Sequence, residues 1–397
     1  MSEELSTKLI HSGDGQFARK LAKTASVPET FPIYHTSVFS FDDIADVDAI
    51  YDKEADGYIY SRIAAPNADA VSEILAAADG AEKALVFASG MAAITTTVLS
   101  LVSQGDHIIA SNVLYGGVQD YFANELPRFG VDVTFVNLLD EDIRPYIKEN
   151  TKLVYTEVIS NPLIEVPDLE ALAGTAHAHG LKLLADNTFG TPVIIKPLAL
   201  GADAVLYSAT KYLGGHSDIV AGAVCGGTDL IDRVKRFLVL YGAVAGPHDC
   251  WLLARSLRTL ELRVRRQSES ALAVARFLEN HPQVEKVFYP GLKSSPSYER
   301  AVRQFEGGFF GGMLSIDLKG GENAAIALLN ALDKITIVPS LAGTATTVSW
   351  AARTSHRFYK REDRLDVGIT DGQLRFSIGL EAENDIIAEL SAALDSI

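Results

Sequence analysis

The sequence predicts an α/β fold in which a large domain with a mostly parallel sheet precedes a smaller α+β domain. Between residues 67 and 207, short apolar runs alternate with helical patterns. Strands that are apolar throughout are typical of a parallel sheet covered by helices on both faces. After Pro247 the pattern changes to a long run of helical spacing, which indicates passage into the second domain. Ligands of such sheets bind beyond the carboxyl ends of the strands, so the search for a site begins there.

The first 60 residues are irregular and rich in Pro, Thr, Ser and aromatic residues, which predicts an extended arm that forms no core of its own. Helical spacing then begins near Asn67 and stops at Gly80. A further helix is predicted over residues 91–102. The clearest helix begins after Asp168, a predicted N-cap, and ends at Gly180.

Six short apolar runs predict the strands of the large domain, at residues 84–87, 107–110, 131–136, 153–158, 181–185 and 204–207. In the second domain we expect strands at 310–318 and 374–378, a helix near 324–332 and a polar helix at the end of the chain. These elements place the arm at residues 1–62, the large domain at 63–256 and the small domain at 257–397.

The charge balance argues against two classes of partner. The chain has 397 residues, with 35 basic and 51 acidic side chains and a formal net charge of −16. Such a surface repels phosphate backbones and anionic lipid, so we expect neither a nucleic acid nor a membrane partner. A basic run within residues 255–266 is expected to pair between helices. Cys225 and Cys250 have no metal-ligand spacing and form no disulfide framework, which indicates a cytoplasmic protein without a metal site.

The segment 207–218 reads YSATKYLGGHSD and carries the strongest chemical signal. A predicted strand runs into small hydroxyl residues, then Lys211, then two glycines, which places the lysine at the mouth of the sheet among compact neighbours. A lysine in a dry pocket has a lowered pKa and can form a Schiff base or act as a base. Ser208 and Thr210 could donate to a phosphate. A lone lysine is more often a solvated loop residue, but the whole string argues against that interpretation.

Two further segments fit the same site. Asp186 follows an apolar strand, and a carboxylate there can keep a ring nitrogen protonated, so that a pyridoxal phosphate (PLP) ring acts as an electron sink. Ser89, Gly90 and Met91 lie between a strand and a helix, where free backbone N–H groups bind phosphate. Taken alone, Asp186 resembles a turn aspartate and the second segment an ordinary strand-to-helix turn. Neither common nucleotide-binding glycine motif occurs in the sequence.

Several motifs occur together in the order found in one enzyme family. They are PIYHTSVF (32–39), YSR (60–62), FASGMAAI (87–94), YGG (115–117), VEKVFYPGL (284–292) and RFSIGLE (375–381), together with the Asp186 and Lys211 segments. On these motifs the chain resembles, over nearly its full length, the Cys/Met-metabolism PLP enzymes, which include cystathionine γ-synthase, cystathionine lyases, methionine γ-lyase and O-acetylhomoserine sulfhydrylase. The resemblance implies the PLP-dependent transferase fold of type I, which is aspartate-aminotransferase-like, and pyridoxal 5′-phosphate as cofactor.

The resemblance also implies roles for residues around the cofactor. Lys211 matches the lysine that holds PLP as a Schiff base and shuttles protons, and Asp186 matches the partner of the pyridinium nitrogen. Tyr115 matches a tyrosine that stacks on the ring and serves as an acid or base. The matches to the phosphate cradle are Gly90, Met91, Ser208 and Thr210.

Other matches concern the substrate and the assembly. Asn161, Ser340 and Arg375 match residues around the cofactor and the substrate carboxylate, for which a planar guanidinium is suited. Tyr60 and Arg62 match a pair that reaches the phosphate of a neighbouring subunit. The family's active unit is a dimer that is commonly paired into a tetramer, so we expect a homotetramer in which the arm makes intersubunit contacts.

The chain departs from the family near the expected far end of the substrate. Enzymes that hold cystathionine have an arginine shortly after YGG, where this chain has Asp120. Acidic residues of those enzymes are replaced by Ile59 and Pro339, and a glutamate by Ala345. The sign of the charge offered to the distal group is thereby reversed. Asp120 either faces solvent, pairs within the protein, or meets a cationic substrate such as canavanine, whose guanidino-oxy leaving group suits γ-elimination.

The expected activity is that of a PLP-dependent carbon–oxygen or carbon–sulfur lyase. It would catalyse γ-elimination, or γ-replacement, on an amino acid with a γ leaving group. The alternatives within the class are methionine γ-lyase and a transferase of the O-acetylhomoserine sulfhydrylase or cystathionine γ-synthase type. A PLP-binding regulator with little turnover is an alternative from another class, but no basic surface patch for DNA is evident in the sequence.

Overall fold

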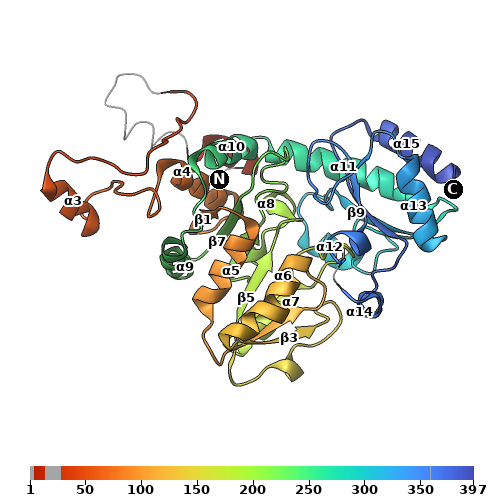
Figure 1. Ribbon diagram of the computed structural model, residues 1–397, viewed down its shortest axis with the longest axis horizontal. Coiled ribbons are helices and arrows are strands. Elements are labelled where there is room, and N and C mark those ends of the chain that lie inside the picture. The colour runs from red at the N-terminus through yellow and green to blue at the C-terminus, as the bar shows by residue number, and fades with distance from the viewer. Residues whose placement is uncertain (1–3, 14–27, 358) are drawn as a thin grey trace.

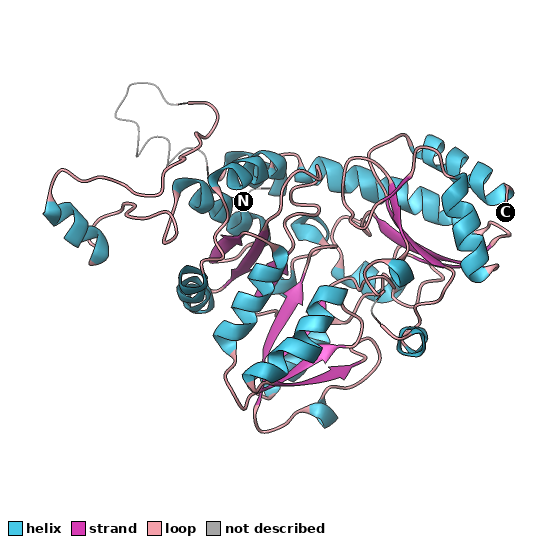
Figure 2. Ribbon diagram, in the orientation of Figure 1, coloured by secondary structure: helices cyan, strands magenta, loops and turns pink. Residues whose placement is uncertain are grey.

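The computed structural model describes residues 4–13, 28–357 and 359–397. Figures 1 and 2 show two sheets with helices packed against each of them. The long helix α11 (Leu260–Glu279) runs from beside the large sheet into the second domain. The predicted fold class, a large α/β domain followed by a smaller α+β domain, is confirmed.

The large sheet has seven strands in the order β1-β7-β6-β5-β4-β2-β3. Strands β2 to β6 are parallel to one another, whereas β7 lies antiparallel between β1 and β6. All six predicted strands are present. Their bounds are β1 Lys83–Phe87, β2 His107–Ser111, β3 Asp132–Val136, β4 Thr151–Glu157, β5 Lys182–Asp186 and β6 Ala204–Tyr207, and β7 is Gly222–Gly226.

The sequence pattern does not predict β7, because its residues GAVCG are small and glycine-rich and resemble a loop. A Cβ added to Gly222 would lie 2.1 Å from the carbonyl oxygen of Ser89. Glycine therefore allows the backbone of β7 to approach the start of helix α5 (Gly90–Leu101) closely.

Helices cover both faces of the large sheet. Val154 and Leu183 belong to one buried cluster, and their neighbours Leu153 and Leu184 to another. Because strand side chains point alternately to opposite faces, each cluster fills one face of the sheet. Helices α4 (Pro66–Asp79) and α7 (Leu169–Ala178) contribute to the first cluster, and α5 and α9 (Thr228–Tyr241) to the second. The helices predicted after Asn67, at 91–102 and after Asp168 are thus all found.

The small sheet has five strands in the order β10-β11-β12-β9-β8. Helices α11, α13 (Gly321–Ala331) and α15 (Glu383–Asp395) pack around it. The chain ends in an amphipathic helix instead of a wholly polar one, since Ile386 and Leu390 of α15 are buried. The predicted strands at 310–318 and 374–378 correspond to two shorter strands. The bounds are β8 Val284–Phe288, β9 Met313–Leu318, β10 Thr336–Ile337, β11 Thr347–Ser349 and β12 Gln373–Ser377.

The remaining elements are short or connect the domains. Helix α10 (Pro247–Leu257) precedes α11 and is separated from it at residues 258–259, where the sequence indicates one continuous helical pattern. The short helices are α6 Gly116–Asp120, α8 Thr191–Ile194, α12 Tyr298–Gln304 and α14 Arg361–Asp366, with single turns at Tyr121–Glu125, Leu126–Phe129, Arg144–Tyr146, Pro197–Leu200 and Ala351–Arg353.

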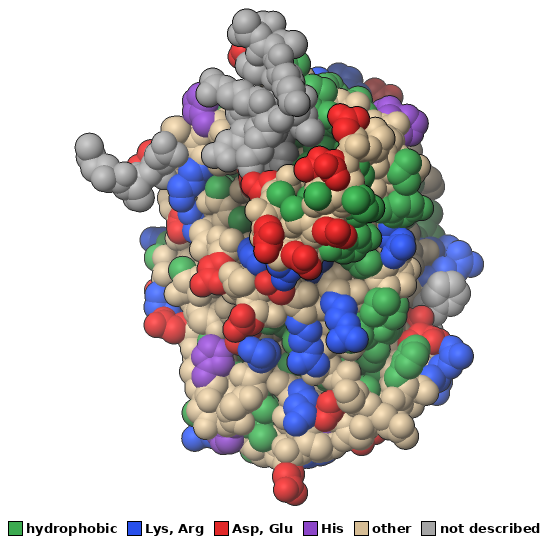
Figure 3. All heavy atoms as spheres, turned by 90° about the vertical axis from the view of Figure 1, so that its left-hand side faces the viewer, with side chains coloured by type: hydrophobic (Ala, Val, Ile, Leu, Met, Phe, Trp, Pro, Cys, Tyr) green, Lys and Arg blue, Asp and Glu red, His purple; other side chains and the backbone are tan. Residues whose placement is uncertain are grey.

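The arm differs from the prediction of an irregular segment. It contains helices α1 (Leu5–His11) and α3 (Ile44–Tyr51). Leu9 of α1 is buried in the core beside α4, so this part of the arm belongs to the large domain's core. Helix α3 projects from the body of the molecule and buries no residue. Figure 3 views this side, where acidic and hydrophobic side chains lie together on the surface.

The described part of the chain has neither a candidate membrane span nor a cluster of metal ligands. None of its helices is both long and apolar enough to cross a bilayer. Nowhere in that part do three or more His, Cys, Asp or Glu side chains gather as metal ligands would. Cys225 and Cys250 are free thiols, and both are buried.

Candidate active site

A cavity of about 260 Å³ lies at the carboxyl ends of β4, β5 and β6, where segments of the small domain close it. Residues from both domains line it, and most of the predicted site residues are among them. Those predicted residues are Ser89, Gly90, Met91, Tyr115, Asn161, Asp186, Ser208, Thr210, Lys211, Ser340 and Arg375.

Lys211 follows β6 and projects into this cavity. Its Nζ donates to the Oγ of Ser340, 2.7 Å away, so the lysine meets the small domain directly. Burial lowers the pKa of Lys211, and the nearby charge of Arg375 lowers it further. The lowered pKa increases the fraction of neutral amine, and the neutral amine is the form that acts as a nucleophile or a base.

Two buried carboxylates end neighbouring strands. Asp186 is the last residue of β5 and lies in register with Glu157, the last residue of β4. Asp186 accepts from the backbone N–H of Thr188 at 2.9 Å and from the Tyr155 hydroxyl at 3.4 Å. Burial raises the pKa of both carboxyls, and Asp186 raises that of Glu157 further. A cationic ring nitrogen beside Asp186 would favour its charged form.

Glu157 is a site residue that the sequence reasoning missed. Its Oε1 accepts the backbone N–H of Tyr115 at 2.6 Å and so fixes the segment that carries this tyrosine. A signal was available, because Glu157 is an acidic residue near the carboxyl end of the predicted apolar strand 153–158, and in the structure it ends β4 as Asp186 ends β5. A polar residue at the carboxyl end of a buried parallel strand is a site candidate wherever it occurs.

The start of helix α5 forms a cradle for an anion. Ser89 caps the helix by accepting the backbone N–H of Ala92 at 3.1 Å. A Cβ on Gly90 would lie 2.7 Å from the Cβ of Ser208, so glycine allows the helix start to lie against the Lys211 segment. Free N–H groups at the helix N-terminus, the Ser208 hydroxyl and the positive end of the helix dipole therefore face one place.

Arg375 lies on β12 and is buried. Its Nη1 donates to the Oδ1 of Asn161 at 2.6 Å, and its Nη2 lies 3.4 Å from the carbonyl oxygen of Ser340. Its Nε is buried and has no partner in the structure. Burial lowers the pKa of Arg375 to about 10, which leaves the guanidinium charged at neutral pH. Arg375 lines the cavity, and a charged guanidinium there suits the predicted carboxylate site.

The small domain holds the Tyr115 segment from the other side. A Cβ on Gly116 would lie 2.1 Å from the carbonyl oxygen of Ser355, so the two backbones touch. His356 is buried, hydrogen-bonds the backbone of Leu114 and lies 2.9 Å from the Ser355 hydroxyl. Burial, together with Arg375, lowers the pKa of His356 to about 4, so this imidazole is neutral at physiological pH. Tyr115 itself is 47% exposed.

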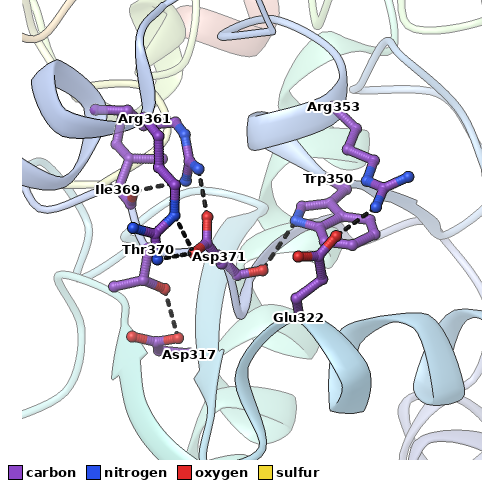
Figure 4. A network of polar contacts seen from close by, with 9 residues as sticks. Asp317, Glu322, Trp350, Arg353, Arg361, Ile369, Thr370 and Asp371 are labelled. Atoms are coloured by element: carbon purple, nitrogen blue, oxygen red, sulfur yellow. Dashed lines mark hydrogen bonds and ion pairs between the residues drawn. The ribbon is translucent and has the colours of Figure 1, made fainter.

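A polar network anchors this wall of the cavity (Figure 4). The indole N–H of Trp350 donates to the backbone oxygen of Asp371 at 3.2 Å, and Arg361 donates to the Asp371 carboxylate at 2.8 Å. Arg353 pairs with Glu322 of α13. Thr354 and Ser355, which line the cavity, directly follow this anchored stretch.

Comparison with known proteins identifies the family. The family model described as Cys/Met metabolism PLP-dependent enzyme matches residues 6–395. The chain belongs to this family. It is 40% identical to L-methionine gamma-lyase of Treponema denticola, over 96% of this chain and 97% of the relative. It is likewise 40% identical to O-succinylhomoserine sulfhydrylase of Pseudomonas aeruginosa, over 92% and 90%.

A solved structure supports the same assignment. The structure of cystathionine gamma-lyase from Lactobacillus plantarum, complexed with L-serine, superposes with a TM-score of 0.91 at 35% identity, covering 100% of this chain and 99% of that one. The predicted type I fold of PLP-dependent enzymes is therefore confirmed, and PLP is the cofactor of this Cys/Met-metabolism enzyme. The prediction of a PLP-dependent lyase of the carbon–sulfur type is also confirmed, by the family and by the lyase names among its relatives.

The residues of the cavity fit PLP. Lys211 provides the amine that would hold its aldehyde carbon, Asp186 an acceptor for its ring nitrogen, and the start of α5 with Ser208 the donors for its phosphate. The hydroxyl of Thr210 bonds the backbone of Ala221, accepting at 3.0 Å, and so holds the Lys211 turn to the neighbouring segment. The cofactor's chemistry is that of an electron sink, which the chain's own groups must position and supply with protons.

Three predicted site residues lie outside this cavity. Asp120 is exposed and accepts from the Nδ2 of Asn124 at 2.7 Å. Arg62 donates to the carbonyl oxygen of Val239 at 2.9 Å, and its guanidinium lies 5.5 Å from the centre of the Tyr60 ring. Tyr60 and Arg62 are on the arm, and their role toward a neighbouring subunit stays a prediction.

Proposed function

We propose that this enzyme catalyses γ-elimination on an α-amino acid whose side chain carries no negative charge at its far end. The observation that carries the proposal is the charge of the cavity wall. Among the described residues that line it, the basic side chains are Lys211 and Arg375. The first is needed for the cofactor and the second for the α-carboxylate, so no lining cation is left for a distal carboxylate such as that of cystathionine.

In the proposed reaction the chain's own groups bind the substrate and move its protons. Arg375, which lines the cavity, binds the α-carboxylate through its guanidinium. The Lys211 amine takes the α-proton and then moves a proton at the β-carbon, and the Tyr115 hydroxyl donates one to the departing γ-substituent. With one water consumed, the products are a 2-oxo acid, ammonia and the protonated leaving group.

Two classes of substrate side chain, uncharged and cationic, are compatible with this cavity wall. A thioether such as that of methionine needs only apolar contacts. A cationic group such as the guanidino-oxy group of canavanine would favour a nearby carboxylate, which Asp120 could supply from helix α6. Asp120 lies near the half-buried Tyr359, because after burial and Glu157 its charge also raises the pKa of that phenol, to about 12.

A substrate panel tests the proposal. Purified enzyme with added PLP should release ammonia from methionine or canavanine much faster than from cystathionine. Faster turnover of cystathionine than of either would contradict the proposed wall. Homoserine release, and consumption of acetylhomoserine in the presence of sulfide, would detect the γ-replacement for which the sulfhydrylase relative is named.

Asp120 decides between the two substrate classes. If the substrate is cationic, Asp120→Ala should lower kcat/KM for canavanine by about tenfold, the equivalent of one charge-assisted hydrogen bond, and leave methionine unchanged. Asp120→Asn, which keeps the shape, is the matched control for charge. Equal effects on both substrates, or no effect, would remove the cationic option.

We further propose a cytoplasmic homotetramer in which the arm of one subunit brings Tyr60 and Arg62 to the phosphate site of another. The exposed position of these residues, away from the cavity of their own chain, supports this arrangement. Light scattering measures the assembly. Mixing Arg62→Ala subunits with Lys211→Ala subunits should restore part of the activity, because hybrids then contain one intact site; no recovery would contradict the shared site.

A further inference from the structure

Arg263 is a buried arginine that hydrogen-bonds to no acidic side chain among the described residues. The sequence predicts that the basic run at 255–266 pairs between helices. Arg265 instead pairs with Glu261 within α11, and Arg266 donates to the backbone oxygen of Glu381. Arg263 is 5% exposed, and all the acceptors of its hydrogen bonds in the described structure are uncharged oxygens.

The guanidinium of Arg263 holds the turn that follows Lys211. Its Nη1 donates to the carbonyl oxygen of Tyr212 at 2.8 Å, and its Nη2 lies 3.5 Å from that of Leu213. The same Nη2 donates to the carbonyl oxygen of Ser256 in the last turn of α10, at 2.9 Å. The side chain therefore links the end of a helix to the two residues next to the cofactor lysine.

Burying this charge is costly, and the cost indicates a role. Burial lowers the pKa of Arg263 to about 10, so the group remains charged while no carboxylate neutralises it. Backbone carbonyl dipoles stabilise the charge in place of a carboxylate. One of these carbonyls, that of Ser256, lies at the negative end of α10. A well-packed apolar side chain at this position would avoid the desolvation but would leave those carbonyls without donors.

Gly215 shows that the turn is shaped around this guanidinium. Its φ is +68°, and a Cβ added there would lie 1.8 Å from the Nη1 of Arg263. The N–H of Gly215 donates to the carbonyl oxygen of Lys211 at 2.7 Å, which closes the turn on the lysine itself. The second glycine after Lys211 is therefore required by Arg263 as well as by its own backbone conformation.

We propose that Arg263 is a positioning residue that fixes the Lys211 turn and thereby places the lysine Nζ in the cavity, where it lies 2.7 Å from Ser340. This inference rests on the role of Lys211 as the cofactor-binding amine. Without the guanidinium the turn relaxes, and the amine moves from its productive place and becomes better solvated. Displacements of about 1 Å in a catalytic group can cost roughly 10²-fold in rate.

The test is Arg263→Gln, with Arg300→Gln as matched control. Arg300 of α12 is half-buried and likewise donates to a backbone oxygen, that of Leu139 at 2.6 Å, but it is not among the residues that line the cavity. We expect Arg263→Gln to lower kcat by about 10²-fold with KM nearly unchanged. In cofactor-free protein, the pH midpoint for labelling Lys211 with an amine-reactive reagent should shift upward. Arg300→Gln should lose stability but shift neither value.

Gly215→Ala gives an independent route to the same effect. It leaves Arg263 in the chain but pushes its guanidinium away, so it should reproduce the loss in kcat. Gly180→Ala is its control, because Gly180 has a φ of +70° with nothing near its added Cβ. Should Arg263→Gln not fold, Arg263→Lys, which keeps the charge but loses the planar fork, decides through the same two measurements.

The outcomes distinguish failure of the inference about Arg263 from failure of the assignment of Lys211. If Arg263→Gln keeps its kcat and its labelling midpoint and merely melts earlier, Arg263 is structural and the inference is overturned. The same holds if Arg263→Lys or Gly215→Ala leaves both values in place. If Lys211 of the unmodified enzyme does not bind the cofactor at all, the assignment of the site has failed instead.

Discussion

The two walls of the cavity are built from different kinds of backbone. On the large-domain side, Glu157, Asp186 and Lys211 stand at or just beyond the ends of neighbouring parallel strands. On the small-domain side, Ser340 and Ser355 lie in loops, and Arg375 lies on a strand. A strand end is fixed by its ladder of hydrogen bonds, whereas a loop is fixed only by the contacts its side chains make.

This difference indicates which side of the cavity can vary between members of the family. The strand-end wall meets the cofactor, which is the same for every member of the family. The loop wall is expected to meet the substrate, and Pro339, one of the departures from the family pattern, lines the cavity there. Its position depends on remote anchors such as the network around Asp371. Breaking one wall at a time should therefore have different consequences.

The largest effect is expected on the strand-end wall. Lys211→Ala removes both the covalent attachment and the proton carrier, so ammonia release should fall by at least about 10³-fold even with excess PLP. The folded structure should persist, as circular dichroism would show. Lys182→Ala, which removes an exposed lysine from β5, is the control and should retain full activity. A Lys211→Ala enzyme of comparable activity would disprove the assignment.

A substitution of Arg375 tests the small-domain side of the cavity. Arg375→Gln removes the buried charge and its free N–H, and losing such a pairing typically costs about 2–5 kcal/mol. We expect kcat/KM to fall by roughly 10²- to 10³-fold, mainly through a higher KM for the amino acid. Arg144→Gln, which changes an exposed arginine paired with Asp142, should change KM little. An unaltered KM in Arg375→Gln would place the carboxylate site elsewhere.

A third prediction concerns the stability of the large domain beneath the cavity. Asp79 is fully buried and accepts from the Tyr207 hydroxyl at 2.7 Å, and burial raises its pKa to about 6. Its folded pKa exceeds its ordinary value of 3.8, so its contribution to stability is complete below that value and is lost as the pH rises through about 6. Asp79→Asn should therefore gain stability over the parent as the pH increases from 5 to 8.

The whole shift from 3.8 to about 6 corresponds to roughly 3 kcal/mol, of which the part above pH 5 is roughly 1.4 kcal/mol, or about tenfold in the folding constant. Urea unfolding of both proteins across this pH range measures it. Glu170→Gln, at an exposed position on α7, controls for the general effect of removing an acid. A difference that is independent of pH would show that Asp79 is ionised throughout or never ionised.

The smallest effect is expected where the loop wall touches the Tyr115 segment. His356→Ala removes the contact with Leu114 and should lower kcat by about tenfold, because Tyr115 loses one of its two supports. Since the pKa of His356 is about 4, the limbs of the pH–rate profile above pH 6 should keep their positions. His281→Ala, a buried histidine of the same domain away from the cavity, is the control. A displaced limb would mean that His356 titrates in the reaction.

The local sequence pattern was sufficient to predict much of the fold and the residues of the strand-end wall. Apolar runs predict β4, β5 and β6, and the polar residues directly after such runs include Lys211. Strand β7 is not predicted by this reasoning, because its first glycine, Gly222, is required by Ser89, which lies far earlier in the chain. The burial of Leu9 in the arm is not predicted either, because a single leucine in an irregular segment shows no hydrophobic periodicity.

The sequence by itself determined the chemistry of the site: the lysine, the aspartate, the helix start and the guanidinium, each recognised from its own short segment. Only the tertiary structure decided how these groups are supported. Glu157 reaches Tyr115 across 42 positions, Lys211 reaches Ser340 across 129, and Arg375 reaches Asn161 across 214. A segment's pattern reflects its own period and turns, whereas burial, pKa shifts and hydrogen-bond partners arise only when distant segments exclude water from the same place.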